Sequence, residues 1–201
     1  MKNKVMPLIC QKPLKEIPSR LMYQLPKKEK VYSEINGGEI YVDVYKMFDT
    51  RTKELVGTMK AAPIMYSNKN VVLYSIPEPY KSFYISSIKV EDKGVGHGSA
   101  FINLAKAESK INGCQGRVHL VASRIFSPNN PPHLFYRKKG FASESSYIDS
   151  TMDFFISMKK QLPLEYADNV AMYLPLKDVN VSLNSRISKI FKFIKEKFAK
   201  I

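Results

Sequence analysis

A glycine-rich turn between a strand-like and a helix-like segment is the feature that most constrains this fold. The turn is Lys93–Ser99, with the sequence KGVGHGS. The segment before it, 82–90, is rich in β-branched and aromatic residues, which predicts a strand. After it, apolar residues recur near helical spacing up to 112–113, an Asn-Gly pair typical of a helix C-terminus. The next segment, 117–123, again has strand composition, so the sequence predicts a strand–helix–strand unit with parallel strands and a right-handed crossover.

The same turn is a candidate site for an anion. The first N–H groups of a helix have no partner within it, and the helix dipole favours negative charge there. Gly94, Gly96 and Gly98 let a ligand approach the backbone without meeting a Cβ atom. A dinucleotide loop requires G-x-G-x-x-G after the first strand of its unit, whereas a long β region precedes these glycines. A nucleoside-triphosphate loop requires G-x-x-x-x-G-K-[ST], which is absent from the sequence. The turn therefore predicts a phosphate site whose ligand has to be identified from the rest of the chain.

Further strands and helices are expected on both sides of this unit. An alternating pattern that starts at Glu39, a polar turn over 49–53 and a returning segment over 55–66 predict a β-hairpin. Other strands are expected over 71–76, where an extended loop is the alternative, and over 169–176. Short helices are expected over 133–139, stopped by a glycine, and over 152–161. Residues 143–150 are expected to form a loop.

The helix over 152–161 is the least decided of these elements. Ser150 and Asp153 have the spacing of a capping box, which favours a helix. Phe154, Ile156 and Met158 also alternate, which is typical of a strand. We expect the helix.

The chain of 201 residues has a formal net charge of +14, and its two ends carry most of the excess. Residues 1–30 contain eight basic and two acidic residues, and residues 182–201 contain six basic residues and one acidic residue. Four prolines break the first of these segments, in which 26–30 is expected to be a solvated connector. The hydrophobic fraction of 44% can supply the core of one domain. Because the two ends carry most of the excess positive charge, the body of the fold is close to neutral.

Residues 182–201 form a basic amphipathic pattern. Isoleucine, leucine and phenylalanine fall on one helical face and most of the lysines on the other, which predicts a helix. We expect it to pack on its own domain or on the second subunit of a homodimer. An anionic membrane surface or an acidic partner, protein or nucleic acid, is the alternative.

Cysteine content and hydropathy bear on the compartment. The only cysteines are Cys10 and Cys114, without a Cys-x-x-Cys pair or a Cys/His cluster, so neither a disulfide scaffold nor a metal is expected. No apolar run is long enough to span a membrane, and the N-terminus lacks the apolar core of a secretory signal. The sequence therefore predicts a cytoplasmic protein without bound metal.

A second motif identifies the ligand class. It is Tyr136-Arg-Lys-Lys-Gly-Phe141, preceded by Asn129. Together with Lys93-x-x-Gly96-x-Gly98, this arrangement resembles the GNAT (Gcn5-related) N-acetyltransferase family. That family has the loop Arg/Gln-x-x-Gly-x-Gly/Ala, and later an Asn seven residues before the Tyr of Tyr-x-Lys-x-Gly-Phe. The resemblance covers 39–176, and both motifs occur in the expected order.

The resemblance implies a fold, a division of the chain and an activity. The fold is α/β (α+β), with a mixed, mostly antiparallel central sheet flanked by helices and a C-terminal amphipathic helix. The chain divides into a Pro-broken basic segment over 1–38, an acetyltransferase domain over 39–176 and a basic helix over 177–201. The activity is transfer of an acetyl group from acetyl-CoA to a primary amine by direct attack. The resemblance does not indicate the acceptor amine.

It also implies roles for individual residues. Tyr136 would protonate the departing CoA thiolate, and Asn129 would hydrogen-bond the pantetheine arm. Backbone groups of Ile88 and Val90 would pair with that arm like an additional strand. The turn would bind the CoA pyrophosphate through the backbone N–H groups of Gly94, Val95, Gly96, His97, Gly98 and Ser99. Lys93 would stand at the basic position of the cofactor loop.

The chain departs from the family pattern at informative places. Lys93 replaces the usual Arg or Gln, and 82–90 contains no carboxylate where many relatives keep a general base. Water is therefore as good a candidate for the base as any named residue. Two alternatives stay open: a non-catalytic acyl-CoA-binding or interaction module, and a peripheral membrane or nucleic-acid binder that uses the basic ends. Single residues have alternative roles as well. Tyr136 can be a packing residue, and His97 and His119 can be structural residues.

Overall fold

The computed structural model describes residues 18–33, 38–66, 80–125, 127 and 129–175. Their strands form one seven-stranded sheet in the order β1-β2-β3-β4-β5-β7-β6. The first four strands are antiparallel neighbours, and the pair β4–β5 is parallel. The strands are β1 (Leu21–Ser33), β2 (Gly38–Asp49), β3 (Leu55–Tyr66), β4 (Tyr80–Val90), β5 (Val118–Ala122), β6 (Ala142–Ser143) and β7 (Val170–Tyr173). The mixed, mostly antiparallel sheet expected from the resemblance is confirmed.

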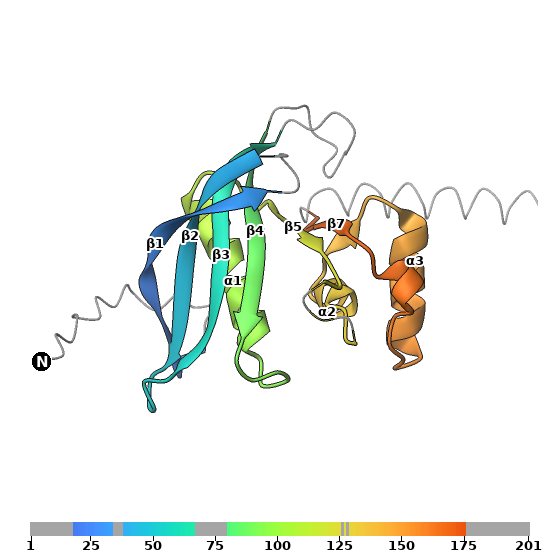
Figure 1. Ribbon diagram of the computed structural model, residues 1–201, viewed down its shortest axis with the longest axis horizontal. Helices are drawn as coiled ribbons and strands as arrows, with labels where there is room; N and C mark the ends of the chain where they lie inside the picture. Colours follow the sequence, from blue (N-terminus) through green and yellow to red (C-terminus); the bar gives the residue numbers. More distant parts are fainter. Residues whose placement is uncertain (1–17, 34–37, 67–79, 126, 128, 176–201) are drawn as a thin grey trace, which may run out of the picture.

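The helices occupy two places. α1 lies behind β3 and β4, and α2 and α3 lie together at the β5–β7 end of the sheet (Figure 1). Gly140, at φ 90°, follows α2 as predicted, and Asn112 ends α1 as predicted. The helices are α1 (His97–Ile111), α2 (His133–Lys138), α3 (Ser146–Ser157) and the short 3-10 helix η1 (Leu164–Tyr166).

The main core lies between α1 and the sheet. Phe101 and Leu104 of α1 are fully buried, as is Phe83 of β4. A smaller apolar cluster covers the opposite face of the sheet and includes Val42 and Tyr84. Successive β4 residues alternate between these two faces, so Phe83 and Tyr84 anchor β4 on both sides.

The predicted connector over 26–30 is wrong, because these residues lie in β1. Lys28 pairs with Asp43 of β2 in the strand register, and their side chains form an ion pair of 3.1 Å. The register shifts between Gln24 and Lys27, beside Pro26. Proline is tolerated there because β1 is an edge strand and because its pairing with β2 is irregular at this point. The N–H group that proline lacks is therefore not needed for strand pairing. The sheet therefore begins within the segment 1–38.

The predicted loop over 143–150 is also wrong, since α3 begins inside it. The N-cap is Ser145, whose Oγ accepts a hydrogen bond from the N–H of Ile148 at 3.4 Å. The predicted cap Ser150 instead donates its hydroxyl to the C=O of Ser146 at 2.8 Å, inside the helix. A helix was the right choice over a strand, although it starts earlier and ends at Ser157 rather than 161.

Several predictions fall outside the described residues. These are the element over 71–76 and the basic helix over 182–201. Within the described part of the chain, no helix is both long and apolar enough to cross a membrane.

Candidate functional site

The strands β4 and β5 separate after a short paired region. Their parallel pairing extends from Phe83 to Ile85 on β4. Beyond this point β4 continues to Val90 and pairs with β3 alone, Ile88 lying opposite Met59. In the described structure, the edge of β4 that faces β5 therefore takes no part in sheet pairing beyond Ile85. Its backbone groups need hydrogen-bond partners, which an extended ligand can supply.

The glycine turn follows β4 and forms the N-terminus of α1. Gly94 and Gly96 adopt φ angles of 84° and 95°, in the left-handed region that favours glycine. Gly96 is the N-cap and makes no side-chain cap bond. The first helical hydrogen bond runs from the N–H of Ala100 to the C=O of Gly96 at 3.1 Å. The N–H groups of residues 97–99 therefore lie outside the helical ladder, and the first turn contains no acidic residue to compete for them.

The surface above this turn is open. A Cβ atom built on Gly94 or Gly96 would meet no atom within 4 Å. Residues 91–96 are all exposed. The predicted phosphate turn thus combines donor groups, a favourable helix dipole and free volume.

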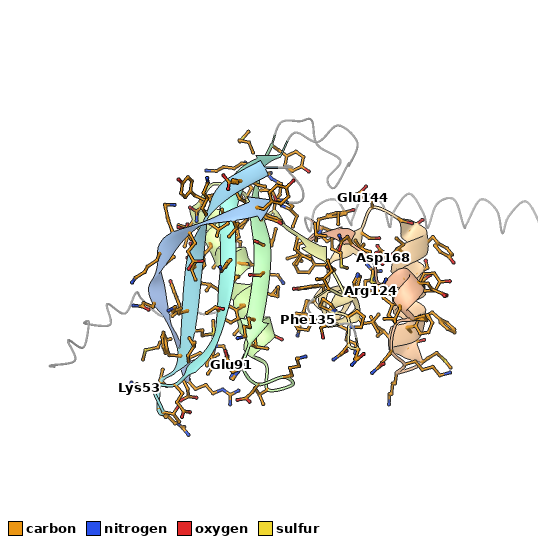
Figure 2. All side chains as sticks on the ribbon, viewed as in Figure 1. Lys53, Glu91, Arg124, Phe135, Glu144 and Asp168 are labelled. Atoms are coloured by element: carbon orange, nitrogen blue, oxygen red, sulfur yellow. The ribbon has the colours of Figure 1, made fainter. Side chains whose placement is uncertain are left out.

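Gly98 serves a different purpose from its two neighbours. A Cβ atom at this position would lie 3.0 Å from Cζ of Phe135, so glycine allows α2 to pack against the start of α1. Figure 2 shows Phe135 on the side of α2 toward β4. The contact brings the second sequence motif next to the first.

Tyr136 lies within this packing. Its ring makes edge contacts with Phe135 and Phe141, at centroid distances of 5.2 and 5.7 Å. Burial raises the pKa of its phenol to about 12, so the hydroxyl remains protonated at neutral pH. Tyr136 can therefore donate a hydrogen bond throughout the physiological range.

An ion-pair network fixes the helix that carries Tyr136. Arg137 donates from Nε and Nη2 to the two carboxylate oxygens of Asp153 on α3, at 2.7 and 2.6 Å. Its Nη1 lies 3.1 Å from Asp149, which also accepts the N–H of Ser143 at 2.8 Å. Bidentate pairing of this kind is directional, so it fixes the orientation of α2 against α3.

Asn129 lies in the turn that leads to α2. It is exposed, and its side chain makes no hydrogen bond within the described structure. This position agrees with the ligand contact expected for Asn129, which stays a prediction.

The histidines at this end of the sheet are buried. Nδ1 of His119 lies 2.8 Å from Oγ of Ser82, and burial lowers the pKa of His119 to about 3. The ring of His119 also contacts Tyr84. In α2, Nε2 of His133 lies 2.9 Å from the C=O of Asp168, and burial lowers its pKa as well. Both imidazoles are neutral at physiological pH. His119 links β5 to β4 through Ser82, and His133 links α2 to the segment before β7 through Asp168.

The carboxylates that directly follow β4 are those of Glu91 and Asp92. Both lie in the exposed turn, and Glu91 lies 3.9 Å from Nζ of Lys89. Among the described residues, no group of His, Cys, Asp and Glu is arranged to hold a metal ion.

Two residues near the turn were missed by sequence analysis. Nη2 of Arg20 donates to the C=O of Val95 at 3.1 Å, across 75 positions of the chain. No local pattern indicates such a contact. Gly57 of β3 is needed because a Cβ atom there would lie 2.5 Å from the C=O of Lys89. A lone glycine inside a strand is a recognised signal of close backbone approach, so Gly57 could have been found.

Comparison with known proteins gives distant structural similarities. No protein-family model matches the chain, and no curated protein matches it. A crystal structure of a bacterial toxin is 14% identical, with a TM-score of 0.43, and the match covers 71% of this chain and 72% of that one.

Two further structures involve acetyltransferases or acetyl-CoA. The histone acetyltransferase HPA2 and related acetyltransferase from Corynebacterium glutamicum is 16% identical, with a TM-score of 0.37, over 67% of this chain and 64% of that one. A mutant AtaT toxin bound to the C-terminus of the antitoxin AtaR and acetyl-CoA is 13% identical, with a TM-score of 0.39, over 71% and 72%. At these values the similarities do not bear on activity, substrate or partner.

Proposed function

We propose that this protein is an acetyl-CoA-dependent N-acetyltransferase that acts on a primary amine. One observation carries the proposal: an uncapped, glycine-lined helix N-terminus directly follows a strand edge that is open for pairing. A ligand with an extended amide arm attached to a pyrophosphate fits both parts. Acetyl-CoA has this construction and presents an activated acetyl group.

In this proposal the chain holds acetyl-CoA through its backbone. The N–H groups at the start of α1 bind the pyrophosphate, and the groups of Ile88 and Val90 pair with the pantetheine arm. Asn129 hydrogen-bonds the same arm. These contacts fix the thioester relative to the incoming amine, which lowers the entropic part of the barrier.

Tyr136 stabilises the departing sulfur. Burial raises the pKa of its phenol to about 12, above the ordinary range of a thiol, so proton transfer from Tyr136 to a thiolate is uphill. The phenol therefore acts mainly as a hydrogen-bond donor to the developing negative charge, and the final proton comes from solvent. A hydrogen bond to a charged group contributes about 1.5–3 kcal/mol.

The amine must lose a proton, and β4 offers no carboxylate for that task. Water is the proposed acceptor, because the acidic residues Glu91 and Asp92 lie in the exposed turn beyond the strand. Activity should then rise with pH as the acceptor amine becomes neutral.

The test is a titration of CoA-free protein with acetyl-CoA, followed by an acetyl-transfer screen against a panel of amines. We expect binding in the micromolar range and transfer to at least one amine. In Tyr136→Phe, kcat should fall about 10- to 100-fold, the equivalent of one charge-assisted hydrogen bond. Tyr41→Phe, at an exposed tyrosine of β2, is the control and should leave kcat unchanged. Absence of acetyl-CoA binding at micromolar concentrations refutes the proposal.

The second candidate is an acyl-CoA-binding module without turnover. The lack of a carboxylate in β4 favours it. Acetyl-CoA binding without transfer to any amine, together with wild-type binding by Tyr136→Phe, would support this candidate over the enzyme.

A further inference from the structure

We infer that Arg20 binds a phosphate group of acetyl-CoA beside the glycine turn, an inference that rests on the proposed function. Arg20 precedes β1 and lies outside both sequence motifs. Its side chain nevertheless reaches the turn, where Nη2 donates to the C=O of Val95 at 3.1 Å. Val95 is the residue between the two left-handed glycines.

The backbone of Arg20 is anchored independently of this contact. Its C=O accepts a hydrogen bond from the N–H of Thr50 at 2.8 Å, and the next residue, Leu21, donates to Pro18 at 2.8 Å. Thr50 belongs to the turn between β2 and β3. The guanidinium is therefore delivered to the glycine turn from a fixed position on the sheet.

Most of the guanidinium remains available to a ligand. A guanidinium has five N–H donors, and the contact with Val95 uses one of them. Arg20 is exposed, and no carboxylate of the described residues forms an ion pair with it. The nearby carboxylate of Asp49 accepts the N–H groups of Arg51 and Thr52 at 2.7 and 3.1 Å, which are the main causes of its lowered pKa. The charge of Arg20 lowers that pKa further, although the two side chains do not form an ion pair.

The end of β4 and the turn carry no net charge of their own. Lys89 and Lys93 balance Glu91 and Asp92, and the ammonium of Lys89 lies 3.9 Å from Glu91. Arg20 adds a positive charge beside the N–H groups of the turn, and its planar fork matches phosphate oxygens in a way that the ammonium of Lys93 does not.

The experiment measures the affinity of wild-type protein, Arg20→Gln and Arg51→Gln for three ligands. These are acetyl-CoA, 3′-dephospho-acetyl-CoA and S-acetylpantetheine, which lacks every phosphate of the CoA moiety. Arg51→Gln is the matched control, because it removes the same charge from the adjacent turn between β2 and β3. Calorimetry suits the first two ligands, and an NMR titration suits S-acetylpantetheine.

We expect Arg20→Gln to bind acetyl-CoA about 10-fold more weakly while its affinity for S-acetylpantetheine is unchanged. If Arg20→Gln loses the same affinity for 3′-dephospho-acetyl-CoA as for acetyl-CoA, Arg20 contacts the pyrophosphate. If it loses affinity for acetyl-CoA alone, Arg20 contacts the 3′-phosphate. Arg20→Lys, which keeps the charge and loses the fork, should lie between wild type and Arg20→Gln.

Three results would overturn the inference. The first is an Arg20→Gln variant that binds acetyl-CoA as tightly as wild type. The second is an Arg20→Gln variant that loses as much affinity for S-acetylpantetheine as for acetyl-CoA, and the third is an Arg51→Gln variant that loses as much acetyl-CoA affinity as Arg20→Gln. The proposed function fails separately, through wild-type protein that does not bind acetyl-CoA.

Discussion

Gly96 offers the sharpest test of the glycine turn, because a matched glycine lies at the other end of the same helix. Gly96 and Gly113 have φ angles of 95° and 74°, and a Cβ atom on either would meet nothing within 4 Å. Replacement by alanine should therefore cause the same backbone strain at both positions. Only Gly96 adjoins the proposed phosphate site.

The expected loss of stability follows from the backbone alone. A left-handed conformation costs a residue with a Cβ about 1–2 kcal/mol. Alanine also restricts the unfolded chain, which offsets about 0.4–1 kcal/mol of this cost. Each variant should lose about 1 kcal/mol of unfolding free energy, equivalent to a Tm lower by about 2–4 °C in a chain of this size. Urea unfolding of both variants checks this value.

The expected loss of binding distinguishes the two variants. The methyl group of Gly96→Ala projects into the free volume above the turn and keeps a phosphate from the N–H groups. Acetyl-CoA affinity should fall at least 10-fold, about 1.4 kcal/mol, in Gly96→Ala and stay at the wild-type value in Gly113→Ala. Calorimetric titration measures both. Equal affinities of the two variants would refute the assignment of the turn to phosphate binding.

Further predictions concern the scaffold around the site. Gly57→Ala should lose about 1–3 kcal/mol of unfolding free energy, because its Cβ would lie 2.5 Å from the backbone oxygen of Lys89, whereas Gly38→Ala, with no atom within 4 Å, should be close to neutral. The pKa of His119 is about 3 when folded and about 6.5 when unfolded, so its stabilising effect is complete above pH 6.5 and declines as pH falls toward 3. Between pH 7 and pH 5, the unfolding free energy of the wild type in urea should fall by about 2 kcal/mol more than that of His119→Asn. Equal decreases in the two proteins would contradict the low pKa of folded His119. Arg137→Ala should destabilise the fold by about 1 kcal/mol, mainly because the partly buried Asp149 loses its cation, whereas the more exposed Asp153 is solvated by water. A thermal melt within about 1 °C of wild type would show that the network contributes nothing.

The elements that were predicted correctly are those whose signals are local. The hairpin of β2 and β3 follows from alternation around a polar turn, and α1 follows from apolar spacing that ends at Asn112. The glycine turn before α1 was recognisable because closely spaced glycines between a strand and a helix indicate a turn at an open helix N-terminus. The left-handed φ angles of Gly94 and Gly96 and the packing role of Gly98 were not predicted. These signals act over a few residues, so they are present in the sequence itself.

The errors came from segments where tertiary contacts override local signals. Proline and lysine over 26–30 indicate a connector, but pairing with β2 supplies enough hydrogen bonds to hold that segment in an edge strand. The sequence favoured Ser150 as the cap of this helix, whereas Ser145 caps it and Arg137 of α2 pairs with Asp149 and Asp153 of α3.

The sequence by itself determined that a glycine turn starts a buried helix, and it predicted that this turn binds phosphate and that Tyr136 belongs to the same site. The tertiary structure alone decided three further points: where β4 parts from β5, why Gly98 must be small, and which distant cation reaches the turn. The pairing register, the contact with Phe135 and the reach of Arg20 all join residues far apart in the chain. Their energies depend on where the whole sheet places each segment, and no local pattern of residues encodes that placement.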